Sequence, residues 1–243
     1  HVFSGWQKTM GGILFLALAV AAPSISAEKA KKVAPTKENR VSAFEITEGD
    51  RTFIELREAA KRNDVARTQA LAASLSNYPY DDYVAYFRIK PQLFDSAGGA
   101  RADSNADSQV VAFLNQYQGT ALADRMRNDW LLVLGKRKDW SRFDAEYPKF
   151  VLDDDTQVKC YSLQSKLAQG ENPTKVAIDA RAILLDPRYF GQACQELVPA
   201  LVGAGGMTPS EAKSIGRAAS EMGFDTMSRR LGGEDPIAEI VKA

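Results

Sequence analysis

The chain has 243 residues, of which 45% are hydrophobic and 26% are charged. These are the proportions of a globular protein, and they suffice for one large domain or two small ones. Lys and Arg together number 31, as do Asp and Glu. This balance argues against a nucleic-acid-binding surface, which requires a basic excess.

The N-terminal segment predicts an export signal. Lys8 supplies a positive charge, residues 11–22 form an apolar run, and the small residues of 23–27 allow cleavage after Ser26 or Ala27. The apolar run is shorter than the roughly 20 residues that span a bilayer. We therefore expect residues 1–27 to be removed, leaving no stable membrane span, and we expect the protein in the periplasm. An uncleaved anchor is the alternative.

Residues 28–49 differ in composition from the rest of the chain. Basic residues alternate there with Ala and Pro, and apolar periodicity is weak. We interpret this segment as a flexible, solvated linker. Attraction of its lysines to an anionic surface is the alternative.

Residues 50–243 predict an all-α domain, because no sustained run alternates apolar and polar residues as a strand does. Apolar residues recur instead at helical spacing. The expected stripes are Phe53, Leu56 and Ala60; Val65, Leu71 and Leu75; Tyr83, Phe87 and Leu93; Val110, Val111, Leu114 and Tyr117; and Leu122, Met126, Trp130 and Leu134. A loop is expected over 98–108.

Capping signals mark further helices. Asp139 precedes a short helix that carries Trp140 and Phe143. Cap residues stand before proline in Asn172-Pro173 and Asp186-Pro187, and Thr208-Pro209-Ser210-Glu211 is a capping box. The basic triplet 136–138 is expected to interact with the carbonyl end of its own helix. About ten helices with short connections predict an α-solenoid, that is, a superhelical array of αα-hairpins.

The only two cysteines, Cys160 and Cys194, each lie on the apolar stripe of a predicted helix. A third helix, over 173–185, lies between these two. A disulfide would therefore connect one helix to the next but one, which suits a row of helix pairs in which alternate helices are neighbours. Export makes oxidation possible. The alternative is two buried free thiols.

The sequence offers no catalytic, cofactor-binding or metal-binding residues. Its one histidine is His1, within the expected signal, which excludes a Ser-His-Asp or Cys-His site in the mature chain. The acidic run 153–155 lacks the alternate spacing of a calcium loop and is expected at a helix N-terminus. Tyr80, Tyr83 and Tyr86 have one-face spacing and are expected in the core. A glycosidase that uses Asp81 or Glu211 is a remote third reading.

The stretch from Phe53 to about Gly206 resembles the N-terminal superhelical, U-shaped domain of soluble lytic murein transglycosylases. Residues 75–86 look like that family's Leu-x-x-Tyr-Pro-Leu-x-x-Tyr-x-x-Tyr segment. Residues 113–131 are similar to its Phe-Leu, Leu-x-x-Arg and Trp-Leu stretch, and residues 137–143 to its Arg-x-Asp-Trp-x-x-Phe element. Cys160-Tyr161 and 194–197 resemble its paired cysteines.

The resemblance implies a role in peptidoglycan glycan-strand cleavage and cell-wall turnover. That family forms a 1,6-anhydro product through a Glu followed by Ser in a C-terminal lysozyme-like domain. No Glu-Ser dipeptide occurs here, so no catalytic residue is assigned. We interpret residues 50–243 as a scaffold that is incomplete at its C-terminus. It would be monomeric and would meet peptidoglycan through the missing domain. A non-enzymatic periplasmic helical-repeat adaptor that binds a protein or peptide is the main alternative.

Overall fold

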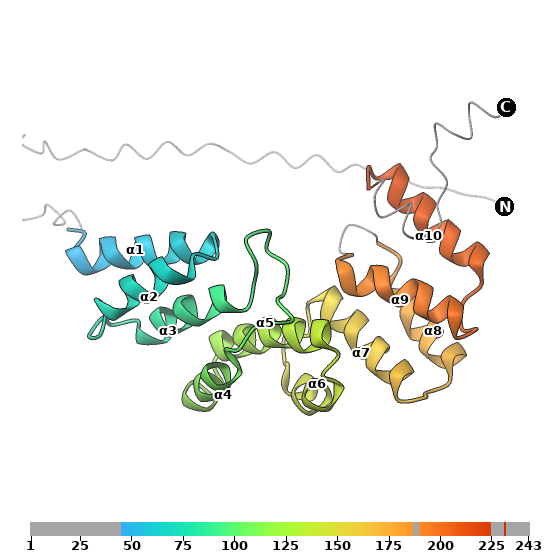
Figure 1. The fold of residues 1–243 in the computed structure, drawn as a ribbon, viewed down its shortest axis with the longest axis horizontal. Helices are drawn as coiled ribbons and strands as arrows, with labels where there is room; N and C mark the ends of the chain where they lie inside the picture. Colours follow the sequence, from blue (N-terminus) through green and yellow to red (C-terminus); the bar gives the residue numbers. More distant parts are fainter. Residues whose placement is uncertain (1–44, 187–189, 225–230, 232–243) are drawn as a thin grey trace, which may run out of the picture. The chain divides into compact units, whose positions relative to one another are not determined.

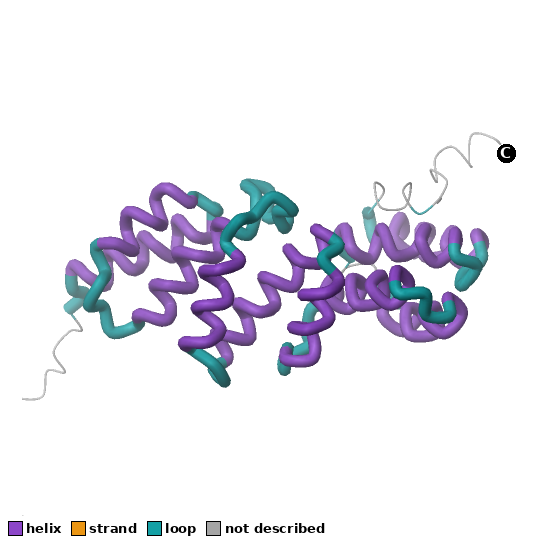
Figure 2. Tube along the Cα trace, turned by 60° about the horizontal axis from the view of Figure 1, so that its bottom comes forward, coloured by secondary structure: helices purple, strands orange, loops and turns teal. Residues whose placement is uncertain are grey.

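The protein is described by a computed structural model, which covers residues 45–186, 190–224 and 231. This part of the chain contains ten α-helices (Figure 1) and no strand (Figure 2), apart from an isolated bridge between Phe94 and Ala100. The expected all-α class is confirmed. The helices are α1 (Glu48–Lys61), α2 (Val65–Ala73), α3 (Asp81–Ile89), α4 (Asp107–Gln116), α5 (Ala121–Arg137), α6 (Trp140–Glu146), α7 (Thr156–Ala168), α8 (Pro173–Ile183), α9 (Gln192–Gly203) and α10 (Pro209–Glu221).

Helix α1 begins at Glu48, within the last residues of the expected linker. A capping box starts it there: the Thr47 hydroxyl accepts a hydrogen bond from the Asp50 N–H, and the Asp50 carboxylate accepts one from the Thr47 N–H. The chain divides between Glu45 and Ile46, and all ten helices belong to the second part. The expected signal and nearly all of the expected linker lie outside the described residues.

The other capping signals are confirmed where the structure describes them. Asp139, Asn172 and Thr208 each accept hydrogen bonds from the first backbone N–H groups of α6, α8 and α10. Glu211 completes the capping box with Thr208. The start expected at Asp186-Pro187 cannot be compared, since Pro187 lies outside the described residues.

Alternate helices are neighbours, as the cysteine spacing predicts. The odd-numbered helices pack in succession, α1 on α3, α3 on α5, α5 on α7 and α7 on α9. Each of α2, α4, α6 and α8 packs against the two odd-numbered helices that flank it in the sequence. Most tertiary contacts therefore join elements that are close along the chain, as expected for stacked helix pairs.

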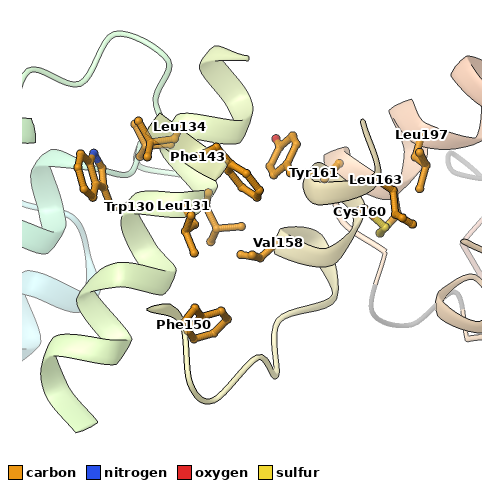
Figure 3. Close-up of a cluster of buried hydrophobic side chains, with 14 of the residues drawn as sticks. Trp130, Leu131, Leu134, Phe143, Phe150, Val158, Cys160, Tyr161, Leu163 and Leu197 are labelled. Atoms are coloured by element: carbon orange, nitrogen blue, oxygen red, sulfur yellow. A yellow bond between two sulfur atoms is a disulfide. The ribbon is translucent and has the colours of Figure 1, made fainter. Parts of the chain in front are cut away.

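Helix α5 is the most enclosed element. Its residues 130–135 are all buried, whichever way they face, because α3, α4, α6 and α7 surround it. Figure 3 shows how its apolar side chains meet those of the next helices: Leu131 of α5 lies beside Phe143 of α6 and Val158 of α7, whereas Trp130 lies on the far side of α5. Burial of each such side chain stabilises the fold by about 1.5–3 kcal/mol.

Most residues of the expected apolar stripes lie in the core, but Tyr83 and Val111 are exposed. Leu56, Leu71, Leu114, Met126 and Leu134 are all buried. Val111, however, is 42% exposed, and Phe113 takes its expected place in the core of α4. The reason is geometric: Val110, Phe113 and Leu114 share one helical face, whereas a residue directly after Val110 is turned away from it.

Gly135 is required by a close contact that the sequence did not reveal. The Tyr161 ring of α7 packs against the α5 backbone at the place where a Cβ of residue 135 would stand. Tyr161 itself is buried and lies between α5 and α9 (Figure 3). The absence of a side chain at Gly135 thus lets α5 and α7 approach each other.

Cys160 of α7 and Cys194 of α9 are paired at disulfide distance, with their Cα atoms 5.1 Å apart. Both side chains are fully buried. The intervening α8 packs against both helices that the pair connects. The expected linkage of a helix to the next but one is therefore the arrangement that the structure has.

We expect Gly135→Ala to lower the free energy of unfolding by about 1–3 kcal/mol, because the new methyl group would overlap the Tyr161 ring. Helix propensity alone predicts the opposite sign, a gain of about 1 kcal/mol. Gly203→Ala in α9 is the matched control, since open space surrounds that position. Urea unfolding measures both variants, and equal stabilisation by the two would contradict the packing argument.

Replacement of both Cys160 and Cys194 by Ala should lower the free energy of unfolding by about 3–4 kcal/mol, because the pair closes a loop across a sequence separation of 34 residues. Alanine keeps the buried sites apolar. Thermal unfolding with and without a reducing agent provides the control: the reducing agent should destabilise the wild-type protein and leave the double variant unchanged. Superimposable curves for all four samples would exclude the linkage.

Candidate functional site

The acidic run 153–155 has a structural role. Asp155 caps α7 by accepting hydrogen bonds from the Gln157 and Val158 N–H groups. Asp154 forms a two-point ion pair with Arg125, and Asp153 accepts a hydrogen bond from the Tyr147 hydroxyl. Within the described residues, no group of three or more His, Cys, Asp or Glu side chains is placed to hold a metal ion.

Two of the three tyrosines that were expected in the core lie at the surface. Tyr80 is 58% exposed and Tyr83 is 43% exposed, whereas Tyr86 is buried. Helix α3 places Tyr86 toward α5, and the residue one turn earlier falls at the edge of that interface. Asp81, which begins the same helix, accepts a hydrogen bond from the Tyr117 hydroxyl at 3.0 Å.

Glu211 is held by its capping role and by an ion pair. Its carboxylate accepts the Thr208 N–H and pairs with the Arg181 guanidinium at 2.8 Å. The Thr208 hydrogen bond and then Arg181 lower the pKa of Glu211 to about 2. A carboxyl group with so low a pKa remains ionised near neutral pH, which does not suit a general acid.

A buried polar network joins α3 to α5. The Tyr86 hydroxyl donates to Asp129 at 2.7 Å, and the Lys90 ammonium lies 3.1 Å from the same carboxylate oxygen. Lys90 also lies over the Tyr86 and Phe94 rings. The buried Asp129 carboxylate thus accepts hydrogen bonds from the Tyr86 hydroxyl and the Lys90 ammonium, which is what burial of a charged group requires.

Burial dominates the electrostatics of this network. It raises the pKa of the Asp129 carboxyl, against the opposing effect of the Lys90 ammonium and the Tyr86 hydroxyl. Burial, and then the charge of Asp129, raises the pKa of the Tyr86 phenol, which therefore remains a hydrogen-bond donor. The network is enclosed between two packed helices, so its role is to fix α3 on α5.

The basic triplet 136–138 does not act as one unit at the end of α5. Arg137 reaches the first residue of α4, where its guanidinium binds Asp107 at 2.6 Å. Asp107 also accepts the Trp130 indole N–H and pairs with Arg142, so it joins α4 to α5 and α6. Lys136 contacts Gln192. Lys136 and Arg137 lie in the last turn of α5, as expected for cations at the carbonyl end of a helix, and their side chains also contact residues outside α5.

A pocket of about 430 Å³ lies among α6, α7, α8 and α9. We call it the Trp140 pocket. Small side chains and backbone form much of its wall, and an indole ring and three polar side chains complete it. Its lining residues are Lys138, Trp140, Gln164, Leu167, Ala168, Gly170, Glu171, Pro173, Ala200 and Ala204.

Only some of the polar groups that line the Trp140 pocket have a hydrogen-bond or ion-pair partner within the described residues. Gln164 is 9% exposed, and its amide nitrogen donates to the Ala193 carbonyl at 2.7 Å. Its amide oxygen accepts no hydrogen bond within the described residues. The Lys138 ammonium likewise has no partner there, whereas Glu171 pairs with Lys175 at 2.8 Å. The amide oxygen is not one of the buried atoms that lack a hydrogen-bond partner, so it is accessible to solvent, and Lys138 is exposed.

A second pocket, of about 360 Å³, lies between α2, α3 and α4. Asp81 and Arg88 line it, and Gln92 and Gln109 close it with a reciprocal pair of amide hydrogen bonds. Alanine, leucine and valine side chains form the rest of its wall together with Gln69 and Ser76. No aromatic ring lines this second pocket.

Sequence reasoning did not find either pocket. Trp140 was expected only on the same short helix as Phe143; its ring packs on that of Phe143, with centroids 6.0 Å apart, and it remains half-buried. Gln164 is a polar residue on the buried side of α7, one turn after Cys160. That position was the available signal, because a glutamine among apolar core positions needs a polar partner.

Comparison of the chain with protein-family models, with curated protein sequences and with solved structures finds no significant match. No helix within the described residues is long and apolar enough to span a membrane.

Tyr86→Phe should lower the free energy of unfolding by about 1–3 kcal/mol, because it leaves the buried Asp129 carboxylate without one of its donors. Tyr83→Phe, one turn earlier on α3, is the control. Its hydroxyl is at the surface and has no partner in the described structure, so we expect a change within about 0.5 kcal/mol. Equilibrium unfolding in urea compares the two, and similar values would contradict the role of the network.

Proposed function

We propose that this chain is the exported superhelical scaffold of a lytic murein transglycosylase. It would act in the cleavage of peptidoglycan glycan strands, and a lysozyme-like domain outside this chain would carry the catalytic glutamic acid. The observation that carries the proposal is the pairing of Cys160 with Cys194 across α8. It joins the two helices whose cysteines resemble those of that family.

The order of helix contacts supports the scaffold role. A row of odd-numbered helices flanked by even-numbered ones is the contact pattern of an αα-hairpin array, and such arrays present extended surfaces. We propose that this array curves into part of the U-shaped wall that confines a glycan strand. In this role the helices supply position and surface, and they take no part in bond cleavage.

The residues of the resemblance support the proposal through their packing. Trp130 and Phe143 are core residues at the junction of α4, α5 and α6, and Tyr86 anchors α3 on α5. Arg137 and Trp130 meet on Asp107. Residues that resemble the family's motif therefore lie where one helix pair packs on the next. In a superhelix, this packing would restrict which residue types fit at those positions.

The proposal assigns no acid or base to this chain. Transglycosylation without water requires one carboxyl group that first donates and then accepts a proton, and such a group needs a raised pKa in a cleft open to substrate. Among the described residues, the carboxyl with a raised pKa is that of Asp129, and it is enclosed between α3 and α5. Glu211, which is exposed, has a lowered pKa.

The protein recovered from the periplasm of a bacterial expression host should begin after Ser26 or Ala27 and carry no free thiol. Because the proposed wall would lie along the glycan strand, the protein should sediment with purified peptidoglycan sacculi. It should release no 1,6-anhydro products from them, because this sequence contains no Glu-Ser dipeptide. Non-reducing mass spectrometry, a sedimentation assay and chromatography of the digest measure these results. The Cys160→Ala, Cys194→Ala double variant is the control for the thiol measurement.

Three outcomes would overturn the proposal. Unpaired thiols in exported protein would remove the observation on which it rests, and release of anhydro products would place catalysis in this chain. Failure to bind sacculi, together with binding to a periplasmic protein or peptide, would favour the adaptor.

A further inference from the structure

We propose that an exposed row of aromatic rings on α1, on α3 and on the turn before α3 docks a proline-containing peptide segment that carries lysine or arginine. This docking surface goes beyond the scaffold function and does not depend on it. Its basis is a set of contacting rings beside carboxylates that have no ion-pair partner. We call this set the aromatic strip, and its members are Phe53, Tyr78, Tyr80, Tyr83 and Phe87.

The rings of the aromatic strip form an unbroken series of contacts around Phe53 of α1. The centroid of the Phe53 ring lies 5.0 Å from that of Tyr78 and 6.4 Å from that of Tyr80. It lies 5.9 Å from the centroid of Phe87, which is in turn 6.2 Å from that of Tyr83. These are the separations of interacting aromatic pairs. The strip therefore presents several adjacent rings rather than one isolated ring.

The aromatic strip combines a fixed base with an exposed outer part. Phe53, Tyr78 and Phe87 are half-buried, because they pack on the apolar cluster formed by α1, α2 and α3. Tyr80 is 58% exposed and Tyr83 is 43% exposed, and both rings contact the base. Because the base holds these two rings in place before a partner binds, little conformational freedom is lost on binding.

Three carboxylates beside the strip have no ion-pair partner within the described residues. Asp50 accepts a hydrogen bond from the Tyr78 hydroxyl at 2.8 Å, and Asp81 accepts one from the Tyr117 hydroxyl at 3.0 Å. Asp82 accepts one from the next backbone N–H at 2.8 Å. The dipole of α3 favours acidic residues in its first turn, but it supplies no cation to neutralise them. Negative charge therefore remains beside the rings.

This charge distinguishes among the candidate occupants of the strip. A second copy of the chain, paired by two-fold symmetry, would bring the same carboxylates toward one another, and like charges repel. An anionic membrane surface or a nucleic acid would be repelled for the same reason. A lysine or arginine side chain instead gains an ion pair with a carboxylate and a cation–π contact with an exposed tyrosine ring. The surface is therefore complementary to a cationic peptide.

The aromatic rings account for the proline in the proposed peptide. Proline-rich segments dock on surfaces lined by aromatic side chains, because their polyproline II conformation is already extended before they bind. This conformation has three residues per turn, so every third residue lies on the same edge, about 9 Å from the last. Cations at every third position therefore share one edge, while the prolines contact the rings. A neutral sugar also stacks on tyrosine, but it leaves the carboxylates unneutralised.

The test measures the binding of fluorescent peptides to the purified full chain by fluorescence anisotropy. The main probe consists of three Pro-Pro-Lys repeats. Three Pro-Pro-Gln repeats keep the conformation without the charge, and three Gly-Ser-Lys repeats keep the charge without the conformation. We expect the main probe to bind about tenfold more tightly than either control, because it alone makes both the ring contacts and the ion pairs. Added salt should weaken its binding, since surface ion pairs are screened.

Substitutions of Tyr80 test the ring contacts. Tyr80→Ser should lower the affinity for the main probe about tenfold, because it removes the most exposed ring. Serine is favoured at the N-cap position of α3 that Tyr80 occupies, so the helix should still begin there. Tyr80→Phe keeps the ring and should bind like the wild type. Val151→Ser, at an 85% exposed position outside the strip, is the matched control and should leave binding unchanged.

Substitution of the carboxylates tests the charge. The double variant Asp81→Asn, Asp82→Asn should lower the affinity for the lysine probe about threefold to tenfold and leave the affinity for the glutamine probe unchanged. Asparagine keeps an oxygen that can accept the Tyr117 hydroxyl and is tolerated at the start of a helix. Circular dichroism and the unfolding midpoint show that each variant is folded.

Equal affinity for the lysine and glutamine probes would overturn the proposal, as would equal affinity for the proline and glycine-serine probes or undiminished binding by folded Tyr80→Ser. Displacement of the main probe by a tetramer of N-acetylglucosamine would make the strip a sugar surface instead. A dimer in sedimentation velocity that Tyr80→Ser dissociates would assign the strip to a second copy. Sedimentation with sacculi is measured separately: its failure bears on the scaffold role alone, and failure of peptide binding bears on the strip alone.

Discussion

The close approach of α7 to the buried end of α5 is the constraint on which the rest of the fold depends. Residues 130–135 have no exposed face, so four helices must pack around them at once. Gly135 allows this, because the Tyr161 ring occupies the space of its missing side chain. A chain with a β-carbon there would have to separate α5 from α7, and the contacts of α7 with α8 and α9 would move with it.

The end of α5 also determines where the polar groups on either side of it lie. Arg137 turns back to Asp107 at the start of α4, while the next residue, Lys138, adopts a left-handed conformation and faces the Trp140 pocket. The backbone then enters α6, whose first residue is Trp140. The C-terminal end of α5 therefore binds the start of α4 through Arg137. The residues that follow it, Lys138 and Trp140, line the pocket. Such a dual role is typical of stacked repeats, in which the connection between two helices both joins neighbouring helix pairs and forms part of the protein surface.

Local sequence signals predicted the helices, because caps and apolar periodicity act within a few residues. Thr208 with Glu211, and Asp139, cap the helices at which they were expected. The alternate-helix contacts followed from the spacing of two cysteines. The sequence could not show which residues at the edge of an apolar stripe are buried and which are exposed. Tyr83 and Val111 were therefore assigned to the core, although they lie at the surface. Gly135, Gln164 and Asp129 were missed because the partners of all three are distant along the chain.

The paired cysteines and the Trp140 pocket are parts of one interface. Gln164 lies one turn after Cys160 on α7, and the carbonyl that it binds belongs to Ala193, next to Cys194 on α9. The sulfur pair and the amide hydrogen bond thus fix the same two helices at successive turns, and Ala200 and Ala204 follow on α9 as the far wall of the pocket. Loss of the sulfur linkage would leave the amide hydrogen bond and the apolar packing of α7 on α9 to hold α9 in place. An oxidising environment therefore favours both the stability of this helix pair and the preorganisation of its pocket.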